Sequence, residues 1–349
     1  MAGTRAKAAH RFYCAQSDKF FSPSQNLPSL AASETLVCAP FMKLTSAFVL
    51  GAGLGTRLKA LTQERPKPLI PVGNKPLITY AFDHLMEVGI TRFVVNTHWR
   101  AEAYPVTFPG GFYRGASVEF RHESPLILET AGGIKNAEEL IGHETFIVYN
   151  GDIFTDLPLA PALRAHAESG NEVTLILRSK DGPLQVSFDH VSGRITDIGK
   201  RIDTTSPAEF LFTGIYIVEP SFFKRIPAAT KLSVIPVFLD MIREGANLGG
   251  IVLDEGQWWD LGTREQYLAV HSHLVSESSH WIDPSARIAA SAQITGATAI
   301  GAGVVVGANT TLHDCIVWEG ASIAEGSLLN QCVITAGAQV SGIHSHADL

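Results

Sequence analysis

Apolar and polar residues follow a strand, helix, strand order in the first part of the chain. Residues 46–50 form a short, continuous apolar run, which is typical of a strand buried on both faces. Apolar residues then recur at helical spacing over 78–87, and Gly89 closes that segment. Residues 92–96 form the next apolar run. This order predicts a βαβ unit and therefore a parallel sheet with right-handed crossovers.

The same patterns predict further elements up to residue 244. Strands are expected at 118–122, 145–149, 173–177 and 210–218, and helices at 159–168 and 233–244. Residues 186–188 and 194–198 alternate on both sides of a turn, which indicates an inserted hairpin that covers one side of the sheet. The expected fold class is therefore α/β, with a Rossmann-like mixed sheet that is mainly parallel.

From residue 282 the pattern changes to a period of six. Large aliphatic residues recur at Ile282, Ile288, Ile294, Ile300, Val306 and Leu312. The period slips by one near Val317 and resumes at Ile323. Such a repeat predicts a parallel β-helix of triangular section, with three or four coils in the length available. We expect three parts: an extension over 1–41, an α/β domain over 42–276 and a β-helix over 277–349.

Composition narrows the class of protein. The chain has 349 residues, enough for two domains, and its 46% hydrophobic and 17% charged residues are typical of a globular protein. No apolar run approaches the roughly 18 residues of a membrane span. The net charge of -7 argues against a general nucleic-acid binder, because such proteins neutralise phosphates with Lys and Arg. We therefore expect small-molecule partners, with no nucleic acid and no membrane.

The cysteines and the amino-terminal segment bear on location. Four cysteines stand without a CxxC pair or zinc-type spacing, which favours a reduced, cytoplasmic protein. Residues 1–41 are rich in Ala and Ser, carry four basic and two acidic residues, and lack the apolar core of a secretory signal. We expect a disordered extension there, or a start assigned too far upstream. An organellar transit peptide is the alternative.

A glycine-rich turn directly follows the first predicted strand. Gly51, Gly53 and Gly55 lack a Cβ, so backbone N–H groups there can approach phosphate oxygens closely. Residues 51–75 include five basic residues and one acidic residue, a local charge of +4 in an acidic chain. The spacing fits neither the P-loop, which needs Lys after its last Gly, nor the GxGxxG dinucleotide fingerprint. The turn predicts a distinct polyphosphate site, with a plain tight turn as the alternative.

Two further positions bring charge to this site. Pro66 and Pro68 fix the backbone on either side of Lys67, so this lysine is held at a set distance from the glycine turn. Asp152 follows the predicted strand at 145–149, and open α/β sheets bind ligands beyond such carboxyl ends. A carboxylate that faces a polyphosphate needs a cation between them, because two anions repel. The alternative is that Asp152 caps a turn.

These motifs resemble a known enzyme family. GxGTRL, followed by PKPLIPV and KPLI, is similar to the signature of the sugar-1-phosphate nucleotidyltransferases, with Gly51 where that family usually has Ala. The resemblance implies in-line attack of a sugar-1-phosphate oxygen on the α-phosphorus of an NTP, with release of pyrophosphate. It assigns Arg57 to the β- and γ-phosphates, and Lys67 to the α-phosphate and the sugar phosphate. Asp152, together with Asp260 of the WWDLGT motif, is implied to bind Mg²⁺.

The resemblance also implies which residues bind the substrates. For the nucleotide these are Gly51, Gly53, Gly55, Thr56, Glu129, Thr130 and Gly132, the last three at a turn against the base and ribose. For the sugar phosphate they are Asn150, Lys200, Thr213 and Gly214, around a pocket formed by the inserted hairpin. Glu129, where many relatives have Gly, is similar to the N-acetylmuramate-1-phosphate uridylyltransferases. Lys200 stands in Gly-Lys-Arg rather than the usual Glu-Lys-Pro, so the sugar-binding Glu is absent.

The substrate and the role of the C-terminal part stay open. A left-handed β-helix tail is typical of mannose-1-phosphate guanylyltransferases and glucose-1-phosphate nucleotidyltransferases, whereas the catalytic part is most similar to the muramate uridylyltransferases. UTP or GTP is expected, for cell-wall or polysaccharide precursors, and the β-helix is expected to form homo-oligomers. The alternatives are an inactive regulatory subunit and an acyltransferase that uses β-helix histidines, namely His313, His344 and His346. His271 and His273 are expected on a helix surface.

Overall fold

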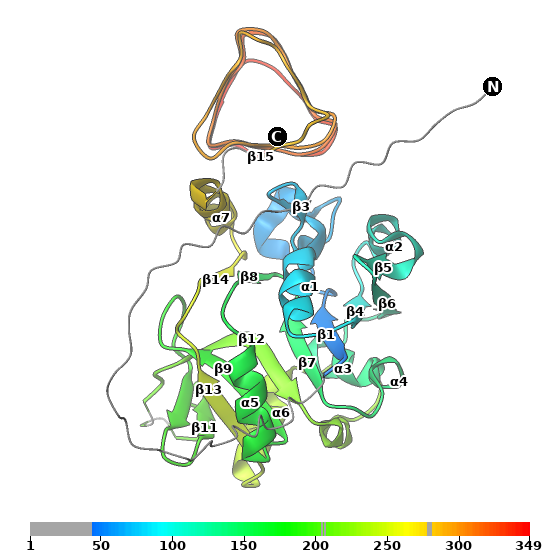
Figure 1. Cartoon of the computed structure of the whole chain (residues 1–349), viewed down its shortest axis with the longest axis vertical. Helices are drawn as coiled ribbons and strands as arrows, with labels where there is room; N and C mark the ends of the chain where they lie inside the picture. The colour runs from blue at the N-terminus through cyan, green and yellow to red at the C-terminus, as the bar shows by residue number, and fades with distance from the viewer. Residues whose placement is uncertain (1–43, 204, 206, 278–280) are drawn as a thin grey trace, which may run out of the picture. The chain divides into compact units, whose positions relative to one another are not determined.

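The structure is a computed structural model that describes residues 44–203, 205, 207–277 and 281–349. The expected extension over 1–41, with Cys14 and Cys38, lies outside the described residues. The described residues form one compact unit. Its α/β part is built on a ten-stranded sheet with the strand order β10-β11-β13-β9-β12-β7-β1-β4-β6-β5 (Figure 1).

The elements predicted for the α/β part occur in the predicted order, and β5, β13, α2, α3 and α4 occur in addition. The strands of the large sheet are β1 Ser46–Leu50, β4 Arg92–Thr97, β5 Phe112–Tyr113, β6 Ala116–His122, β7 Phe146–Asn150, β9 Val173–Arg178, β10 Val186–Asp189, β11 Arg194–Ile198, β12 Leu211–Val218 and β13 Leu248–Val252. The helices are α1 Ile78–Glu87, α2 Ala103–Thr107, α3 Glu129–Asn136, α4 Glu138–Ile141, α5 Ala160–Ser169, α6 Val234–Arg243 and α7 Arg264–Glu277. The 3₁₀ helices are η1 Thr56–Thr62, η2 Lys67–Leu69, η3 Pro109–Gly111 and η4 Pro220–Arg225.

The first half of the sheet confirms the predicted βαβ unit. Strand β1 pairs in parallel with β4 and β7, and α1 lies between β1 and β4 in the chain with the bounds expected from its spacing. Alternate residues of these strands enter two separate hydrophobic clusters, so the clusters lie on opposite faces of the sheet. Helices α1, α2 and α5 contribute to one cluster, and α3, α4 and α6 to the other.

The second half of the sheet is mixed. Strand β12 runs antiparallel to both β7 and β9, and β9 pairs in parallel with β13. The predicted hairpin is present as β10 and β11, which pair antiparallel and join the sheet through β13. The expected fold class is therefore confirmed, but the hairpin extends the edge of the sheet through backbone pairing and does not cover one side of it.

Two small two-stranded pairings lie outside the large sheet. Strands β2 (Pro71–Val72) and β3 (Lys75–Pro76) form a short hairpin. Strands β8 (Ile153–Thr155) and β14 (Trp258–Asp260) pair antiparallel although about a hundred residues separate them. The glycine turn leads into η1, a 3₁₀ helix whose preceding residue Gly55 has φ +62°, a conformation that glycine adopts without strain.

The C-terminal region is a parallel β-helix, as the hexapeptide period predicts. Its twelve short strands are β15 Trp281–Ile282, β16 Arg287–Ile288, β17 Gln293–Thr295, β18 Ala299–Ile300, β19 Val305–Val306, β20 Thr311–His313, β21 Ile316–Val317, β22 Ser322–Ile323, β23 Leu328–Asn330, β24 Val333–Ile334, β25 Gln339–Val340 and β26 Ile343–Ser345. They form three parallel four-stranded sheets, one for each side of the triangle.

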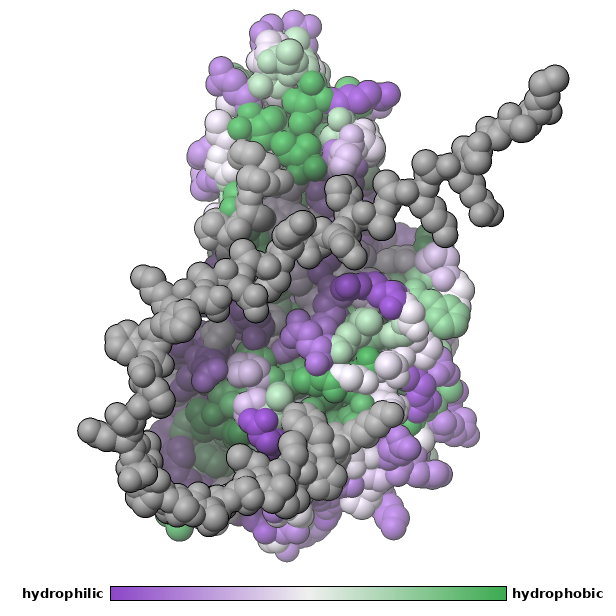
Figure 2. Space-filling view, in the orientation of Figure 1, coloured by the Kyte–Doolittle hydropathy of each residue, from purple (hydrophilic) through white to green (hydrophobic). Residues whose placement is uncertain are grey.

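The register of the β-helix records the slip in the sequence. Partners are eighteen residues apart between the first two coils, as in Ile282 and Ile300, but seventeen apart from β18 to β21. Aliphatic side chains and two free, buried cysteines, Cys315 and Cys332, fill the interior. At the end that faces the viewer in Figure 2, hydrophobic residues are visible within a hydrophilic rim.

One hydrophobic cluster joins the β-helix to the α/β part. It includes Leu58 and Leu61 of η1, Tyr267 and Val270 of α7, and Trp318 of the β-helix, all buried. Helix α7 begins with a capping box, because Gln266 N donates to Thr263 Oγ1 (3.3 Å) and Thr263 N donates to Gln266 Oε1 (3.0 Å). Thr263 therefore caps this helix.

None of the helices in the described part of the chain has both the length and the apolar character to cross a membrane.

Candidate active site

Two adjoining cavities lie beyond the carboxyl ends of β1 and β7. The first has a volume of about 390 Å³ and includes the glycine turn, and the second, of about 340 Å³, lies toward β10 and β12. Arg57, Asn150 and Asp152 line both cavities. These three side chains therefore mark the boundary at which a group bound in one cavity would meet a group bound in the other.

The two predicted acidic residues meet at Lys67. The Nζ atom of Lys67 lies 2.8 Å from Asp152 Oδ2 and 3.4 Å from Asp260 Oδ1. The pairing of β8 with β14 explains this meeting, because Asp260 pairs with Ile153, the residue after Asp152. Lys67 is only 4% exposed, and its charge offsets the repulsion between the two carboxylates.

Arg57 points toward the same acidic pair from the exposed side. Its Nη2 atom lies 3.4 Å from Asp260 Oδ2, and the side chain is largely open to solvent. The guanidinium lies against the backbone of Gly262, where a Cβ would come within 2.6 Å of it. Gly262 is a site residue that the sequence analysis missed, although it belongs to the WWDLGT motif.

Two buried polar side chains hold the glycine turn by hydrogen bonds to the backbone of Gly51. Gly51 N donates to Asn96 Oδ1 (2.8 Å), and Tyr104 Oη donates to Gly51 O (2.7 Å). Burial, and secondarily the charge of Asp152, raises the pKa of Tyr104, so its hydroxyl keeps the proton that it donates. Gly53, Gly55 and Thr56 line the first cavity together with Arg57 and Lys67.

Asn96 also connects the glycine turn to the start of α3. Its Nδ2 atom donates to Glu123 Oε1 (2.7 Å), and Leu128 N donates to Glu123 Oε2 (2.6 Å). Glu123 is 1% exposed, so both of its oxygens are used inside the protein. A Cβ on Gly133 would come within 2.7 Å of both Asn96 and Glu123, which explains the glycine at that position.

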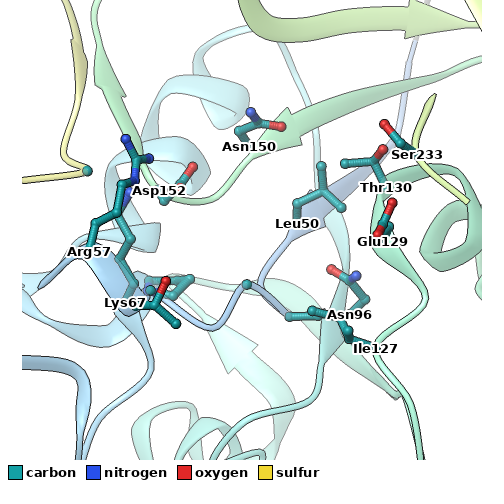
Figure 3. A pocket seen from close by; sticks show the side chains of 16 residues that line it. Leu50, Arg57, Lys67, Asn96, Ile127, Glu129, Thr130, Asn150, Asp152 and Ser233 are labelled. Carbon is teal, nitrogen blue, oxygen red and sulfur yellow. Dashed lines mark hydrogen bonds and ion pairs between the residues drawn. The ribbon is translucent and has the colours of Figure 1, made fainter. Parts of the chain in front are cut away.

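The far end of the first cavity is formed by the start of α3. Glu129 and Thr130 line it, and Figure 3 shows them with Ser233 across the cavity from Arg57, Lys67 and Asp152. Glu129 has φ +59° and lies 3.5 Å from Lys231 Nζ, and the Thr130 hydroxyl accepts from Val234 N (2.6 Å).

Gly132, by contrast, does not line the cavity. Its N–H donates to Leu232 O (3.0 Å), and a Cβ there would lie 2.3 Å from Thr230 O. The structure therefore places Gly132 where α3 packs against residues 230–232.

Only some of the residues predicted to bind the sugar phosphate line the second cavity. Asn150 and Thr213 line it, but the Thr213 hydroxyl donates to Ile176 O (2.8 Å) inside the sheet. Gly214, with φ +82°, makes room for Asn150, since a Cβ would come within 2.4 Å of Asn150 Nδ2. Lys200 is exposed and lines neither of the two cavities.

Several lining residues were not singled out from the sequence. In the first cavity they include Leu50, Asn96, Ile127 and Ser233, and in the second Asp181 and Gln185. Asn96 could have been found, because it lies at the carboxyl end of the strand next to β1, where α/β sheets bind ligands. Asp181 and Gln185 lie in a loop without a motif, so no local pattern points to them.

The buried Arg178 explains how that loop is held. Its guanidinium donates to Asp181 Oδ2 (2.6 Å) and to the carbonyl oxygens of Leu253, Glu255 and Gly256. Arg178 is 0% exposed, so it fixes Asp181 at the cavity wall without lining the cavity itself.

The acidic pair suits a hard cation. Among the described residues no group of three or more Asp, Glu, His or Cys residues forms a complete metal site. Asp152 and Asp260 nevertheless converge within reach of one cation, the Lys67 ammonium, and both remain about one third exposed. Mg²⁺ is commonly held by one or two carboxylates plus substrate phosphates, so this donor set fits it.

Two of the β-helix histidines make local contacts with neighbouring polar groups. His313 Nδ1 lies 3.0 Å from Thr295 Oγ1, and His344 Nε2 lies 2.9 Å from Ser341 O. Neither residue lines one of the cavities described above. His271 was expected on a surface, and this was wrong: it is 1% exposed, and Gly73 N donates to its Nε2 atom (3.2 Å).

Sequence comparison identifies the family. The model of the nucleotidyl transferase family matches residues 46–277, and that of the GMPPB C-terminal domain matches residues 277–345. The chain belongs to the nucleotidyl transferase family. As its relatives are sugar-1-phosphate nucleotidyltransferases, this chain is such an enzyme, and the resemblance found in the sequence is confirmed.

The curated relatives act on different sugars and bases. A mannose-1-phosphate guanylyltransferase of Mycobacterium tuberculosis is 27% identical over 302 residues, which cover 82% of this chain and 83% of that protein. An N-acetylmuramate alpha-1-phosphate uridylyltransferase of Neisseria meningitidis is 30% identical over 217 residues, 62% of this chain and 93% of that protein.

Solved structures agree on the fold of the α/β part. The inositol-1-phosphate CTP transferase of T. maritima has a TM-score of 0.55 at 20% identity, and covers 64% of this chain and 91% of its own. HddC of Yersinia pseudotuberculosis, complexed with GMP-PN, has a TM-score of 0.54 at 22% identity, and covers 65% of this chain and 98% of its own.

Proposed function

We propose that this enzyme transfers GMP from GTP to a hexose 1-phosphate, with mannose 1-phosphate as the first candidate, and releases pyrophosphate. The observation that carries the proposal is the pair of adjoining cavities that share Arg57, Asn150 and Asp152. A nucleotide in the cavity of the glycine turn and a sugar phosphate in the other would bring their reacting phosphates together at these side chains.

The chain supplies position and charge rather than a nucleophile. Phosphoryl transfer is helped mainly by holding the reacting groups in line and by neutralising developing charge. Lys67, buried beside the boundary, would contact the α-phosphate and the sugar phosphate. Arg57, on the exposed side, would hold the β- and γ-phosphates of the leaving pyrophosphate. Amides of Gly53, Gly55 and Thr56 would complete the phosphate site.

We assign Mg²⁺ to Asp152 and Asp260. When bound, the ion would neutralise phosphate charge and help to align the attack. The Lys67 ammonium already offsets the charge of both carboxylates, and the same two side chains remain accessible from the cavities.

Two observations favour a guanylyltransferase. The Mycobacterium tuberculosis relative covers 82% of this chain, which is more than the α/β part alone, and residues 277–345 match the GMPPB C-terminal domain. Glu129 lines the far end of the nucleotide cavity, and a carboxylate is an acceptor for hydrogen bonds. The N1–H and N2–H groups of guanine are adjacent donors that suit this acceptor, whereas uracil offers one N–H between two carbonyl oxygens.

The second candidate is uridylyl transfer to N-acetylmuramate 1-phosphate. It is supported by the 30% identity of the Neisseria meningitidis relative over the catalytic part and by the sequence around Glu129. Glucose 1-phosphate is a further acceptor to test. Each of these activities would serve the synthesis of cell-wall or polysaccharide precursors, which we expect in the cytoplasm, with the β-helix available for self-association.

A substrate matrix tests the proposal. Purified protein with Mg²⁺ is incubated with each of GTP, UTP, ATP, CTP and dTTP against mannose, glucose, N-acetylglucosamine and N-acetylmuramate 1-phosphates. Pyrophosphate release and product mass are measured. GDP-mannose as the main product supports the proposal, and UDP-N-acetylmuramate as the main product replaces it with the second candidate. Absence of pyrophosphate release in every combination would contradict both.

A further inference from the structure

The segment that carries Lys67 is held by the β-helix through side chains that no motif singles out. Arg65 precedes Lys67 by two residues, and its guanidinium donates to both carboxylate oxygens of Glu319, one of them at 3.3 Å from Nη1. The same guanidinium lies over the ring of Trp318, with Cζ 5.2 Å from the ring centroid. Both partners follow strand β21 in the third coil of the β-helix.

A second set of contacts holds the other side of Lys67. The Nε1 atom of Trp318 donates to Tyr267 Oη (3.0 Å), and this hydroxyl donates to Pro71 O. Trp318 is 4% exposed and Tyr267 is fully buried. The backbone is therefore fixed at Arg65 and again at Pro71, and Lys67 lies between these two points.

The intervening backbone is stiff enough to transmit this support. Pro66 has φ -56° and Pro68 follows directly after Lys67, so the lysine has a proline on each side. Residues 67–69 form the 3₁₀ helix η2 and are buried. A shift of Arg65 would thus move the backbone of Lys67, and with it the ammonium that lies 2.8 Å from Asp152.

We propose that Arg65, Trp318 and Glu319 are positioning residues for Lys67, so that the third coil of the β-helix supports the active site. This inference rests on the proposed catalytic role of Lys67 and assigns the C-terminal region a task beyond self-association. The Arg65–Glu319 pair is partly exposed, and such pairs contribute little to global stability. Its loss is therefore expected to change turnover more than folding.

The test compares Glu319→Gln with a matched control, Glu325→Gln, in the full chain. Glu325 is an exposed glutamate on the same coil. We expect Glu319→Gln to lower kcat about tenfold with a smaller change in the KM for nucleotide, because a misplaced catalytic group loses rate steeply with displacement. Trp318→Phe, which keeps an aromatic ring but removes the donor, is expected to lower kcat about threefold. Glu325→Gln is expected to keep the wild-type kcat.

A double variant separates positioning from general damage. If Glu319 acts through Lys67, adding Glu319→Gln to Lys67→Ala should leave the residual kcat unchanged, because the group being positioned is gone. An equal loss with and without Lys67 would overturn the proposal. So would wild-type kcat in both Glu319→Gln and Trp318→Phe. Thermal unfolding and gel filtration show whether Glu319→Gln folds and associates normally. If it does not, the kcat of Trp318→Phe is compared with and without Lys67→Ala in the same way.

The controls also keep this inference apart from the proposed function. If wild type releases no pyrophosphate with any substrate pair, the proposed function has failed. If wild type is active but Lys67→Ala equals it, the proposed role of Lys67 has failed. If Lys67→Ala is impaired while Glu319→Gln and Trp318→Phe match Glu325→Gln, the inference alone has failed.

Discussion

The two ends of the segment from Gly51 to Asn74 are held by different parts of the molecule. At the first end, Asn96 and Tyr104 contact the backbone of Gly51, and both are buried within the α/β part. At the second end, Arg65 contacts the β-helix, and Asn74 Nδ2 donates to Ile300 O (2.8 Å) of the same region. The glycine turn is thus supported by Asn96 and Tyr104 of the α/β part, which we call the first support. The segment that carries Lys67 is supported by the β-helix and α7, which we call the second support.

This difference separates two requirements of the same site. Backbone amides can approach a phosphate closely only if the turn that carries them is fixed. The tightly packed side chains around Gly51 fix this turn. A lysine that contacts two carboxylates needs its backbone held on both sides, which here requires residues up to 254 positions away. Overpacking at Gly51 should therefore appear mainly as lost stability, whereas loss of the partly exposed Arg65–Glu319 pair should appear mainly as lost turnover.

The largest effect on turnover is expected from the charged side chains that line the first cavity. Lys67→Ala or Asp152→Ala should lower turnover by a factor on the order of 10²–10⁴, the scale for removing a charge that stabilises the transition state. Steady-state pyrophosphate release measures this effect. Lys67→Arg is the matched control for charge, because it keeps the cation but not the compact ammonium. Near wild-type turnover in Lys67→Ala would remove the lysine from the mechanism.

The glycine turn and the charged residues beside it could be predicted largely from local sequence, whereas Asn96 and Tyr104, which hold the turn, were not singled out. The glycine turn, Lys67 between two prolines, and Asp152 after β7 stand in short patterns with a physical reason. The six-residue period likewise predicted the β-helix and the slip near Val317, because each coil repeats the same local environment. Asp260 needed the resemblance, since its position beside Asp152 depends on the pairing of β14 with β8.

The second support could not be predicted in this way. Arg65 is one of several charges near the glycine turn, and nothing in its neighbours points to Glu319, 254 residues later. His271 was placed on a surface because helical spacing alone does not show which face packs against β2 and β3. Gly51 stands where the resembled family usually has Ala, and its neighbours in the sequence do not show that the structure leaves no room for a Cβ there. All three depend on long-range packing.

Overpacking the first support should cost the most stability. In Gly51→Ala the new Cβ would lie 2.7 Å from Asn96 O, 2.8 Å from Val95 Cγ1 and 2.9 Å from Tyr104 Oη. We expect a loss of about 3 kcal/mol in the free energy of unfolding, at the upper end for one extra carbon in a packed core. Gly53→Ala is the control, because nothing lies within 4 Å of its Cβ. Equal stability of the two variants, measured in urea, would show that the turn can relax.

The second support should weaken in acid through His271. Burial lowers the pKa of His271 to about 4, against 6.5 in an unfolded chain. The unfolded state therefore binds the extra proton between these values, so the stability from neutral His271 is complete above about pH 6.5 and is lost as the pH falls toward 4. At pH 5 we expect a loss of about 2 kcal/mol from this residue.

The tautomer follows from the partners of the ring. His271 Nδ1 lies 2.8 Å from Tyr267 O and must donate, which leaves Nε2 to accept from Gly73 N. Glutamine offers an acceptor that does not titrate, so His271→Gln should lose less stability than wild type between pH 7.5 and 5. The same pH dependence in both proteins would exclude His271 as its source and leave His84 and His166, whose pKa values burial also lowers.

The smallest effect on stability is expected for Tyr104→Phe. This variant separates the two roles of Tyr104, which fills space beside Gly51 and donates a hydrogen bond to it. Tyr104→Phe keeps the ring but leaves Gly51 O without its donor, so we expect about 1 kcal/mol less stability, the usual net contribution of one hydrogen bond. It also removes one of the three atoms that crowd a Cβ at position 51, so Gly51→Ala should cost less in the Tyr104→Phe background than in wild type. Strictly additive losses in this double-mutant cycle would mean that Asn96 O and Val95 alone limit the space, and that Tyr104 acts only as a donor.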